Sequence, residues 1–307
     1  MTTVERPLDI SSLVSFNSCV SRDLVHRKAL AEVFLTDWAR VGEDSFLLGA
    51  QWPRSHSFYA PRDGRHDPML VAETVRQAGI LLAHKGYDVP LGHSFLMDRI
   101  TLAVHQDEMT VGDEPADLLI EVEARDVLRR ARGINGMRVD MTFRRAGVRI
   151  ASGSGWVRVA GPGVYRRLRW GGEPRLPGPA CSPTPLTPEI VGVTSVDDVV
   201  LGEPTGRWTW PLRVRTGHPV LFDHPLDHVP GMVTLEAMRQ AGRAVLGRPG
   251  AQPLDLDASF PRFLELDREC LVSAEVLKWI SPSVAVLSVQ AIQDGVVAAE
   301  AVLTMAA

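Results

Sequence analysis

The sequence predicts an α+β protein built from two similar halves, each with one long helix and an antiparallel sheet. Two observations support this prediction. Residues 69–79 recur as residues 232–242 without a gap, with Met, Glu, Arg, Gln, Ala and Gly at matching positions, which indicates an internal duplication. In both halves a series of strand-like segments follows this repeated segment, and that order is typical of an antiparallel sheet packed on a helix.

Strands are predicted where apolar residues alternate with polar ones or where β-branched and aromatic residues gather. After an irregular lead-in, the first half has such segments at 29–35, 45–52, 95–104, 117–126, 136–145 and 148–159. The second half has them at 208–214, 259–263, 270–278, 283–293 and 296–305. The order of elements is therefore the same in both halves.

The repeated segment is predicted to be a helix in both halves. Asp67 and Pro68 supply a capping side chain and a proline at the first helical position, and Pro230 and Gly231 have a similar part in the second half. Most residues around the helix circumference are apolar, which is the pattern of a helix enclosed by protein on nearly every side.

A stripe of three polar residues interrupts this apolar surface in each copy. The stripes follow the spacing i, i+3 and i+4 and consist of Glu73, Arg76 and Gln77, and of Glu236, Arg239 and Gln240. An unsatisfied buried polar group costs roughly 2–7 kcal/mol, so the stripes need partners. Two explanations stay open: an internal Glu–Arg pair that fixes packing, or an active site.

The division of the chain follows from the repeat and from glycine and proline usage. We expect a first domain at 1–160, a linker at 161–188 and a second domain at 189–307. The linker contains five Gly and seven Pro in 28 residues, which predicts that it has no regular structure.

Composition narrows the class of protein. Of the 307 residues, 45% are hydrophobic and 23% charged, as in soluble globular proteins. A formal charge of −4 gives no reason to expect nucleic acid as a partner. Basic runs at 129–132, 144–145 and 166–169 are interpreted first as solvated surface and second as docking sites for an acidic carrier protein or a phosphate.

Location is inferred from cysteines and apolar segments. The three cysteines are widely spaced, which predicts no disulfide framework and suits a reducing compartment. Residues 1–7 do not resemble a signal peptide, and no segment approaches the roughly 18 apolar residues that span a bilayer. We expect a cytoplasmic protein without a membrane partner.

Several motifs resemble known families of thioester-processing proteins. A His-bearing loop before a Glu-bearing helix, as at 222–237, resembles the hotdog fold and, within it, 3-hydroxyacyl carrier-protein dehydratases. The chain resembles more broadly the A-factor biosynthesis (AfsA-type) double hotdog family of Streptomyces and relatives. The motifs are VHRKA at 25–29, GAQWPRSHSFY at 49–59, DPMLVAETVRQAGI at 67–80, VPLGH at 89–93 and DHPLDHVPGM at 223–232.

This resemblance implies a tandem hotdog fold and an acyltransferase. Family members condense a β-ketoacyl group, delivered by a carrier protein or coenzyme A, with dihydroxyacetone phosphate. Aldol closure then gives a phosphorylated butenolide, a precursor of γ-butyrolactone or furan signals that control antibiotic production. The resemblance implies no cofactor. The duplication supplies a hotdog pair within one chain, so we expect a pseudo-dimer that functions as a monomer.

Two other functions on the same fold stay open. One is a dehydratase or thioesterase that acts on acyl thioesters. The other is a non-catalytic regulator that binds an acyl chain or a butenolide. The paired Glu and Arg residues favour the transferase, because a phosphorylated acceptor needs an anchor of positive charge and neither alternative does.

Candidate site residues follow from the chemistry. A base is expected among Glu73 and Glu236, whose pKa enclosure would raise, and His224. Phosphate is expected at Arg76, Arg239 or Arg243, because guanidinium binds it bidentately. The oxyanion is expected at backbone N–H groups near Gly231 or Met69. Substrate contacts are also expected from Gln77, Gln240 and His56. A metal site at His224, Asp227 and His228 is disfavoured by the flanking prolines.

Overall fold

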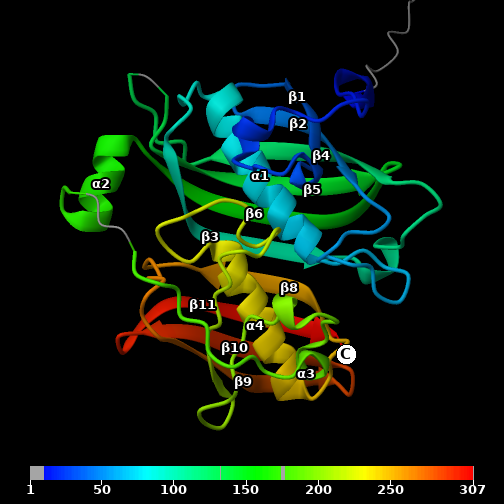
Figure 1. The fold of residues 1–307 in the computed structure, drawn as a ribbon. Coiled ribbons are helices and arrows are strands. Elements are labelled where there is room, and N and C mark those ends of the chain that lie inside the picture. Colours follow the sequence, from blue (N-terminus) through cyan, green and yellow to red (C-terminus); the bar gives the residue numbers. More distant parts are fainter. Residues whose placement is uncertain (1–9, 132, 174–176, 307) are drawn as a thin grey trace, which may run out of the picture.

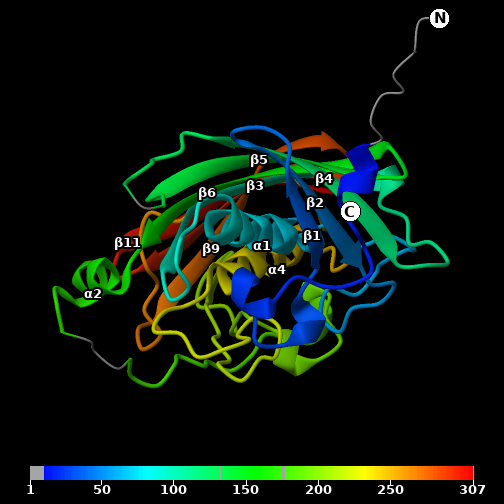
Figure 2. The ribbon, with the colours of Figure 1, turned by 90° about the horizontal axis from the view of Figure 1, so that it is seen from above.

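The computed structural model describes residues 10–131, 133–173 and 177–306. Across these residues, eleven antiparallel strands form one sheet, and two long helices, α1 (Met69–Gly86) and α4 (Gly231–Leu246), lie on the same face of it (Figures 1 and 2). The predicted fold class is confirmed. Residues 1–9, Arg132 of one basic run and residues 174–176 of the expected linker lie outside the described residues.

The first half wraps its strands around α1. All residues of α1 except Arg76 and Lys85 are buried, which confirms the predicted enclosure. The helix lies close to the sheet at Gly153, where an added Cβ would be 2.7 Å from Cγ2 of Val75, so glycine permits this approach. The strands of this half are β1 (Leu35–Arg40), β2 (Ser45–Trp52), β3 (Ser94–Val104), β4 (Ala116–Arg125), β5 (Gly136–Arg145) and β6 (Val148–Ala160).

The second half repeats this arrangement around α4. The helix is buried from Met232 to Arg243, and Gly247 ends it in the left-handed conformation, with φ of 60°. The strands of this half are β7 (Thr209–Pro211), β8 (Gln252–Ser259), β9 (Cys270–Ser281), β10 (Val284–Gln293) and β11 (Val296–Ala306).

The two halves share one sheet. Its strand order is β1-β2-β4-β5-β6-β3-β8-β11-β10-β9-β7, so β3 and β8 pair at the junction. Their register runs from Arg99 opposite Ser259 to Ala103 opposite Asp255. This pairing places α1 and α4 side by side, and it brings the loop before α4 next to the first half (Figure 1). Within the described residues, no helix has the length and apolar character that crossing a membrane requires.

Three local predictions differ from the structure. The segment expected to be a strand at 29–35 contains a 3₁₀ turn, Leu30–Glu32, and β1 begins only at Leu35. The strand expected at 259–263 lies earlier in the chain. It is β8 (Gln252–Ser259), which ends where the expected strand begins. β8 contains a proline and two aspartates, residues that are rare in strands, yet it is paired on both sides, so tertiary pairing outweighs its propensity.

The third difference is α2 (Pro162–Trp170), which lies in the segment expected to have no regular structure. Pro162 occupies the start of this helix, where its fixed φ is favourable, and Gly171 ends it at φ of 71°. Proline and glycine therefore begin and end a helix here instead of preventing one.

Candidate functional site

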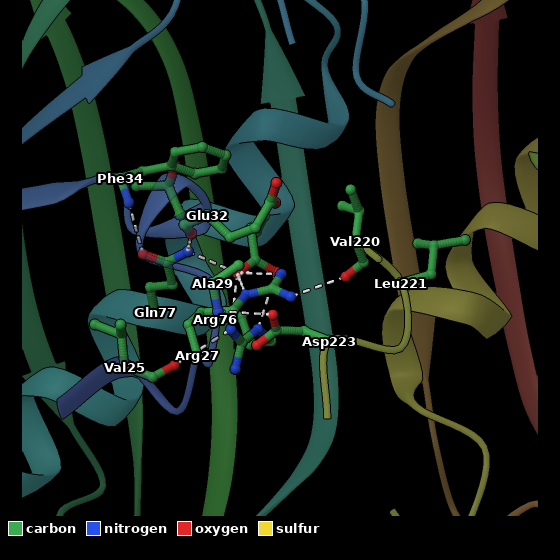
Figure 3. Close-up of polar contacts among 12 residues, drawn as sticks. Val25, Arg27, Ala29, Glu32, Phe34, Arg76, Gln77, Val220, Leu221 and Asp223 are labelled. Atoms are coloured by element: carbon green, nitrogen blue, oxygen red, sulfur yellow. Dashed lines mark hydrogen bonds and ion pairs between the residues drawn. The ribbon is translucent and has the colours of Figure 1, made fainter. Parts of the chain in front are cut away.

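The polar stripe of α1 is an ion cluster centred on the buried carboxylate of Glu73. Glu73 accepts from Nη2 of Arg27 at 2.7 Å, from Nε and Nη2 of Arg76 at 2.9 and 2.7 Å, and from Nε2 of Gln77 at 2.7 Å. Arg27 also donates Nη1 to the carbonyl of Val220 in the second half, at 2.9 Å (Figure 3). The explanation by an internal Glu–Arg pair therefore holds for Glu73.

The electrostatics of Glu73 differ from the prediction. Burial raises the pKa of this carboxyl, but Arg27 and Arg76 beside it outweigh that effect and lower the pKa to about 2. The expectation of a raised pKa is wrong for Glu73, because two guanidinium groups stabilise its anion. A carboxylate so strongly stabilised is a poor base at neutral pH.

The stripe of α4 is equally buried but has a different partner. Nη2 of Arg239 lies 2.7 Å from Oε2 of Glu236, and Nη1 donates to Asp67, the residue that precedes α1. The Arg239 side chain is only 2% exposed, whereas that of Arg76 is 19% exposed. Arg239 is therefore enclosed between two carboxylates, and its expected phosphate contact has no support in this arrangement.

The two glutamines hold the backbone of neighbouring segments. Gln77 accepts from the Phe34 N–H at 3.0 Å and donates to the Glu32 carbonyl at 2.7 Å. Gln240 accepts from the Val200 N–H at 3.0 Å and donates to the carbonyl of Asp198 at 2.8 Å. Both side-chain amides form hydrogen bonds with the backbone in the same way in the two halves. Gln77 and Gln240 therefore have a structural role.

Two loop histidines also repeat a structural role. Nδ1 of His56 accepts from the N–H groups of Phe58 and Tyr59 at 3.1 and 3.0 Å, and Nε2 lies 3.3 Å from Glu32. His218 has the same role in the second half, where Nε2 lies 3.1 Å from Asp198. His56, expected to contact substrate, is instead a loop-capping residue.

The Arg243 guanidinium also forms its hydrogen bonds within the protein. Its Nε donates to the Ala251 carbonyl at 2.9 Å, Nη1 to the Val191 carbonyl at 3.1 Å, and Nη2 to the side chain of Gln252 at 3.1 Å. Burial, followed by repulsion from Arg239, lowers its pKa to about 9. The expected phosphate contact is therefore unsupported for Arg243 too.

A cavity of about 340 Å³, here called the junction cavity, lies where the halves meet. Three of the residues predicted from the sequence line it: Arg76, His224 and Gly231. The other candidates do not; these are Glu73, Glu236, Arg239, Arg243, Gln77, Gln240 and His56. Further walls come from residues 26–27, α1, β3, β5, β6, α2, residues 220–230, the first residues of α4 and the segment after β8.

The start of α4 gives the cavity two unpaired backbone donors. Among the described residues, the N–H groups of Gly231 and Met232 have no hydrogen-bond acceptor, as is usual in the first turn of a helix. The equivalent N–H of Met69 donates to the Asp67 carboxylate at 2.8 Å. Of the two helix starts expected to hold an oxyanion, only that of α4 is therefore open.

The two halves differ at two positions beside the polar stripes of their helices. With the helices aligned on the repeat, Asp67 occupies the position of Pro230, and Arg243 the position of Ile80. Ile80 lines the junction cavity, while Arg243 reaches the carbonyls of Val191 and Ala251. These two substitutions remove the symmetry of the duplication.

His224 lies at the cavity, and its neighbour Asp223 is structural. Asp223 accepts from the backbone N–H groups of Lys28 and Ala29 (Figure 3). His228, at the same wall, pairs with Asp227 at 2.7 Å. Within the described ranges, no group of three or more His, Cys, Asp or Glu side chains is placed to share a metal ion.

Sequence reasoning missed the histidine at position 26. His26 lines the junction cavity, and its backbone has φ of 51°, a left-handed conformation that is rare for residues other than glycine. Its Nε2 lies 3.1 Å from Nε2 of His84 on α1. The available signal was its place in the VHRKA motif, but no spacing rule connects residues 58 positions apart.

Comparisons with known proteins agree with this geometry. The family model for the A-factor biosynthesis hotdog domain matches residues 8–160 and 177–307. A 2-oxo-3-(phosphooxy)propyl 3-oxoalkanoate synthase of Streptomyces virginiae is 45% identical over 85% of this chain and 88% of its own length. A synthase of the same name from Streptomyces coelicolor is 39% identical over 94% and 91%.

Solved structures give the fold alone. An acyl-ACP thioesterase from Bacteroides thetaiotaomicron matches 84% of this chain and 97% of its own with a TM-score of 0.51 and 12% identity. A 12:0-ACP thioesterase from Umbellularia californica matches 84% and 93% with a TM-score of 0.50, again at 12% identity. At 12% identity, this similarity shows a shared fold and does not indicate a shared activity.

Proposed function

The chain belongs to the A-factor biosynthesis hotdog family, and on that premise we propose that it transfers a β-ketoacyl group from a thioester to the hydroxyl of dihydroxyacetone phosphate. The hydroxyl oxygen attacks the thioester carbonyl, the C–S bond breaks, and the hydroxyl proton reaches the thiolate that leaves. The product is a 2-oxo-3-(phosphooxy)propyl 3-oxoalkanoate, which closes by aldol condensation to a phosphorylated butenolide, a precursor of γ-butyrolactone-type or furan signals.

The observation that carries this proposal is the likeness to synthases along nearly the whole chain. Relatives at 45% and 39% identity bear the name of this reaction, and the match includes both halves. Within the chain, the junction cavity unites an open helix start, a partly exposed guanidinium and histidines, which are the groups that acyl transfer to a phosphorylated acceptor needs.

We place the acceptor phosphate at Arg76. This residue is the member of the two stripes that reaches the cavity, and its Nη1 has no partner among the described residues. Glu73 fixes the rest of the guanidinium through Nε and Nη2 and so orients the free edge. Glu73 is thus a positioning residue, and Glu236, enclosed with Arg239, holds the second helix.

We place the thioester carbonyl at the start of α4. The unpaired N–H groups of Gly231 and Met232, together with the positive end of the helix dipole, favour the oxyanion of the tetrahedral intermediate. His224 lies at the same cavity and contacts the substrates there. Its Nδ1 donates to the Pro225 carbonyl at 3.2 Å.

The proposal also includes the carrier of the acyl group. The acyl group arrives on a carrier protein or on coenzyme A. Tyr165 of α2 lines the junction cavity, and the neighbouring Arg166 and Arg167 are exposed, which supports a carrier with an acidic surface.

The free thiols of Cys19, Cys181 and Cys270 support a reducing, cytoplasmic location. The pseudo-dimer within the chain supports a monomer.

The test is a direct assay. The purified chain is incubated with a β-ketoacyl thioester and dihydroxyacetone phosphate, and mass spectrometry follows the phosphorylated ester or butenolide. Parallel reactions use carrier-protein and coenzyme A donors, unphosphorylated dihydroxyacetone, and no enzyme. Ester formed only with the phosphorylated acceptor supports the proposal. Release of free acid without ester would assign a thioesterase, and binding without turnover would assign a regulator.

A further inference from the structure

A chain of two hydrogen bonds fixes the protonation of His26. Nδ1 of His84 lies 2.7 Å from the Val89 carbonyl, and a carbonyl only accepts, so this nitrogen carries the proton. Nε2 of a neutral His84 then has a lone pair and accepts from Nε2–H of His26 at 3.1 Å. The neutral His26 ring therefore has its remaining lone pair on Nδ1.

The free nitrogen of His26 has no other use in the fold. Among the described residues, Nδ1 of His26 makes no hydrogen bond, and the residue lines the junction cavity. The ring is held by Phe95, whose centroid lies 5.0 Å from that of His26 and 5.1 Å from that of His84, both edge-on. The left-handed backbone at His26 ends the 3₁₀ turn Arg22–Val25, and this cap holds the residue beside the cavity.

The charges around His26 keep it neutral at rest. Burial lowers its pKa most, and His84 and Arg76 from α1 and His224 from the loop before α4 lower it further. Asp23, on the short 3₁₀ turn Arg22–Val25, opposes them, and the resulting pKa is about 4. An acceptor phosphate at Arg76 would bring negative charge to this region and favour the imidazolium that forms during proton transfer.

We propose that His26 is the catalytic base of the acyl transfer and that His84 is the residue that positions it. This inference rests on the proposed function. Nδ1 of His26 takes the hydroxyl proton as the acceptor oxygen bonds to the thioester carbon. When the C–S bond breaks, the same proton passes from Nδ1 to the thiolate sulfur, and His26 returns to its neutral form. Nε2–H remains donated to His84 throughout.

The first test replaces His26 by residues that tolerate a left-handed backbone. His26→Gly removes the base and leaves space for an added imidazole, and His26→Asn is the second variant in case the glycine variant does not fold. With wild-type melting temperature as the folding criterion, kcat is expected to fall by about 10²–10⁴-fold, the usual contribution of a positioned base. The control is His105→Gly, at an exposed histidine that does not line the junction cavity, and it should keep wild-type kcat.

Chemical rescue separates a base from a space-filling ring. A series of substituted imidazoles of differing pKa is added to His26→Gly, and kcat is measured for each. A base role predicts rescue whose size depends on the pKa of the added imidazole. Rescue that is equal for all of them, or a folded His26 variant that keeps kcat within about threefold of wild type, would overturn the assignment.

The second test concerns His84. The amide of His84→Gln lies near the position of Nε2 and retains an acceptor for His26, whereas that of His84→Asn lies near Nδ1 and retains only the contact to Val89. We expect kcat to fall by about tenfold or more in the asparagine variant alone, with the KM of both substrates unchanged. In His84→Asn, where Nε2–H of His26 has lost its acceptor, nitrogen-15 NMR of the imidazole ring checks that the proton has left Nε2 of His26. Equal kcat in the two folded variants would remove His84 from this role.

The proposed function fails separately from this inference. If wild-type protein forms no ester, the acyltransferase proposal itself is wrong. If wild-type protein forms ester and the His26 variants behave as wild type, only the base assignment is wrong.

Discussion

Arg239 of α4 donates to the carboxylate of Asp67, which lies two residues before the start of α1 in the other half. Both side chains are almost completely buried, at 2% and 4% exposure. Burial opposes the charge of Arg239, but Asp67 and Glu236 outweigh it and raise the pKa of this guanidinium above its usual value. The contact joins the two helices through charge as well as packing.

We expect Arg239→Met to destabilise the fold by about 3–5 kcal/mol, because it leaves two carboxylates buried without a counter-charge. Urea unfolding measures the change in free energy of unfolding. The control is Arg99→Met, which breaks the exposed pair with Asp257 across the same β3–β8 junction and should cost about 1 kcal/mol or less. Equal costs would show that the buried pair has no special weight.

We expect Glu73 to stabilise the fold in a pH-dependent way. Its pKa is lowered from 4.5 to about 2, so its contribution is fully present above about pH 4.5 and is lost as the pH falls toward 2. In Glu73→Gln, urea unfolding midpoints should therefore be lower than wild type at neutral pH and fall less steeply over that window. The exposed Glu275→Gln serves as the control. A parallel loss in both variants would contradict the lowered pKa.

We expect Arg76→Gln to weaken binding of the acceptor. A hydrogen bond to a charged group is worth about 1.5–3 kcal/mol, so the KM for dihydroxyacetone phosphate should rise about 10- to 100-fold. The KM for the thioester should stay the same. The matched control is Arg158→Gln, at the same cavity but already paired with Asp98 at 2.6 Å. An unchanged acceptor KM in Arg76→Gln would remove Arg76 from the phosphate site.

We expect Gly231→Ala to crowd the junction cavity. An added Cβ would lie 2.7 Å from Cε of Met97, which lines the cavity and must move. Because Cε is the far end of a flexible side chain, the shift of Met97 should cost little stability, but it should move activity toward shorter acyl donors. The double variant Gly231→Ala with Met97→Ala should recover activity with longer donors. If the double variant is no better than the single one, Met97 is not the obstacle.

The fold was largely predictable because periodicity is a local property. The repeated segment at Met69 and Met232 indicated both helices, and alternation indicated most strands within a few residues. β8 was not predicted because its aspartates are unfavourable in strands. Its pairing with β3 and β11 involves segments that are distant in the sequence. α2 escaped because Pro162 and Gly171 were interpreted as breakers, whereas they occupy the positions where a helix begins and ends.

The site was less predictable because its charges are set by distant partners. Glu73 and Glu236 have the same neighbours along their helices, but Arg27 comes from 46 residues before Glu73, and Asp67 from 172 residues before Arg239. These partners determine how strongly the Glu73 carboxylate is stabilised and which guanidinium reaches the cavity. The pairing of His26 with His84 has the same origin, and helical spacing cannot indicate it.

The loss of symmetry between the two helix stripes has a consequence for stoichiometry. In a true dimer of identical hotdog subunits, both equivalent crevices would be open, and each would hold an acyl group. Here Asp67 binds Arg239 and Arg243 binds a backbone carbonyl in the second half, while Arg76 and Ile80 line the junction cavity. The chain should therefore titrate with one equivalent of acyl donor, and its second copy acts as a permanent scaffold for the first.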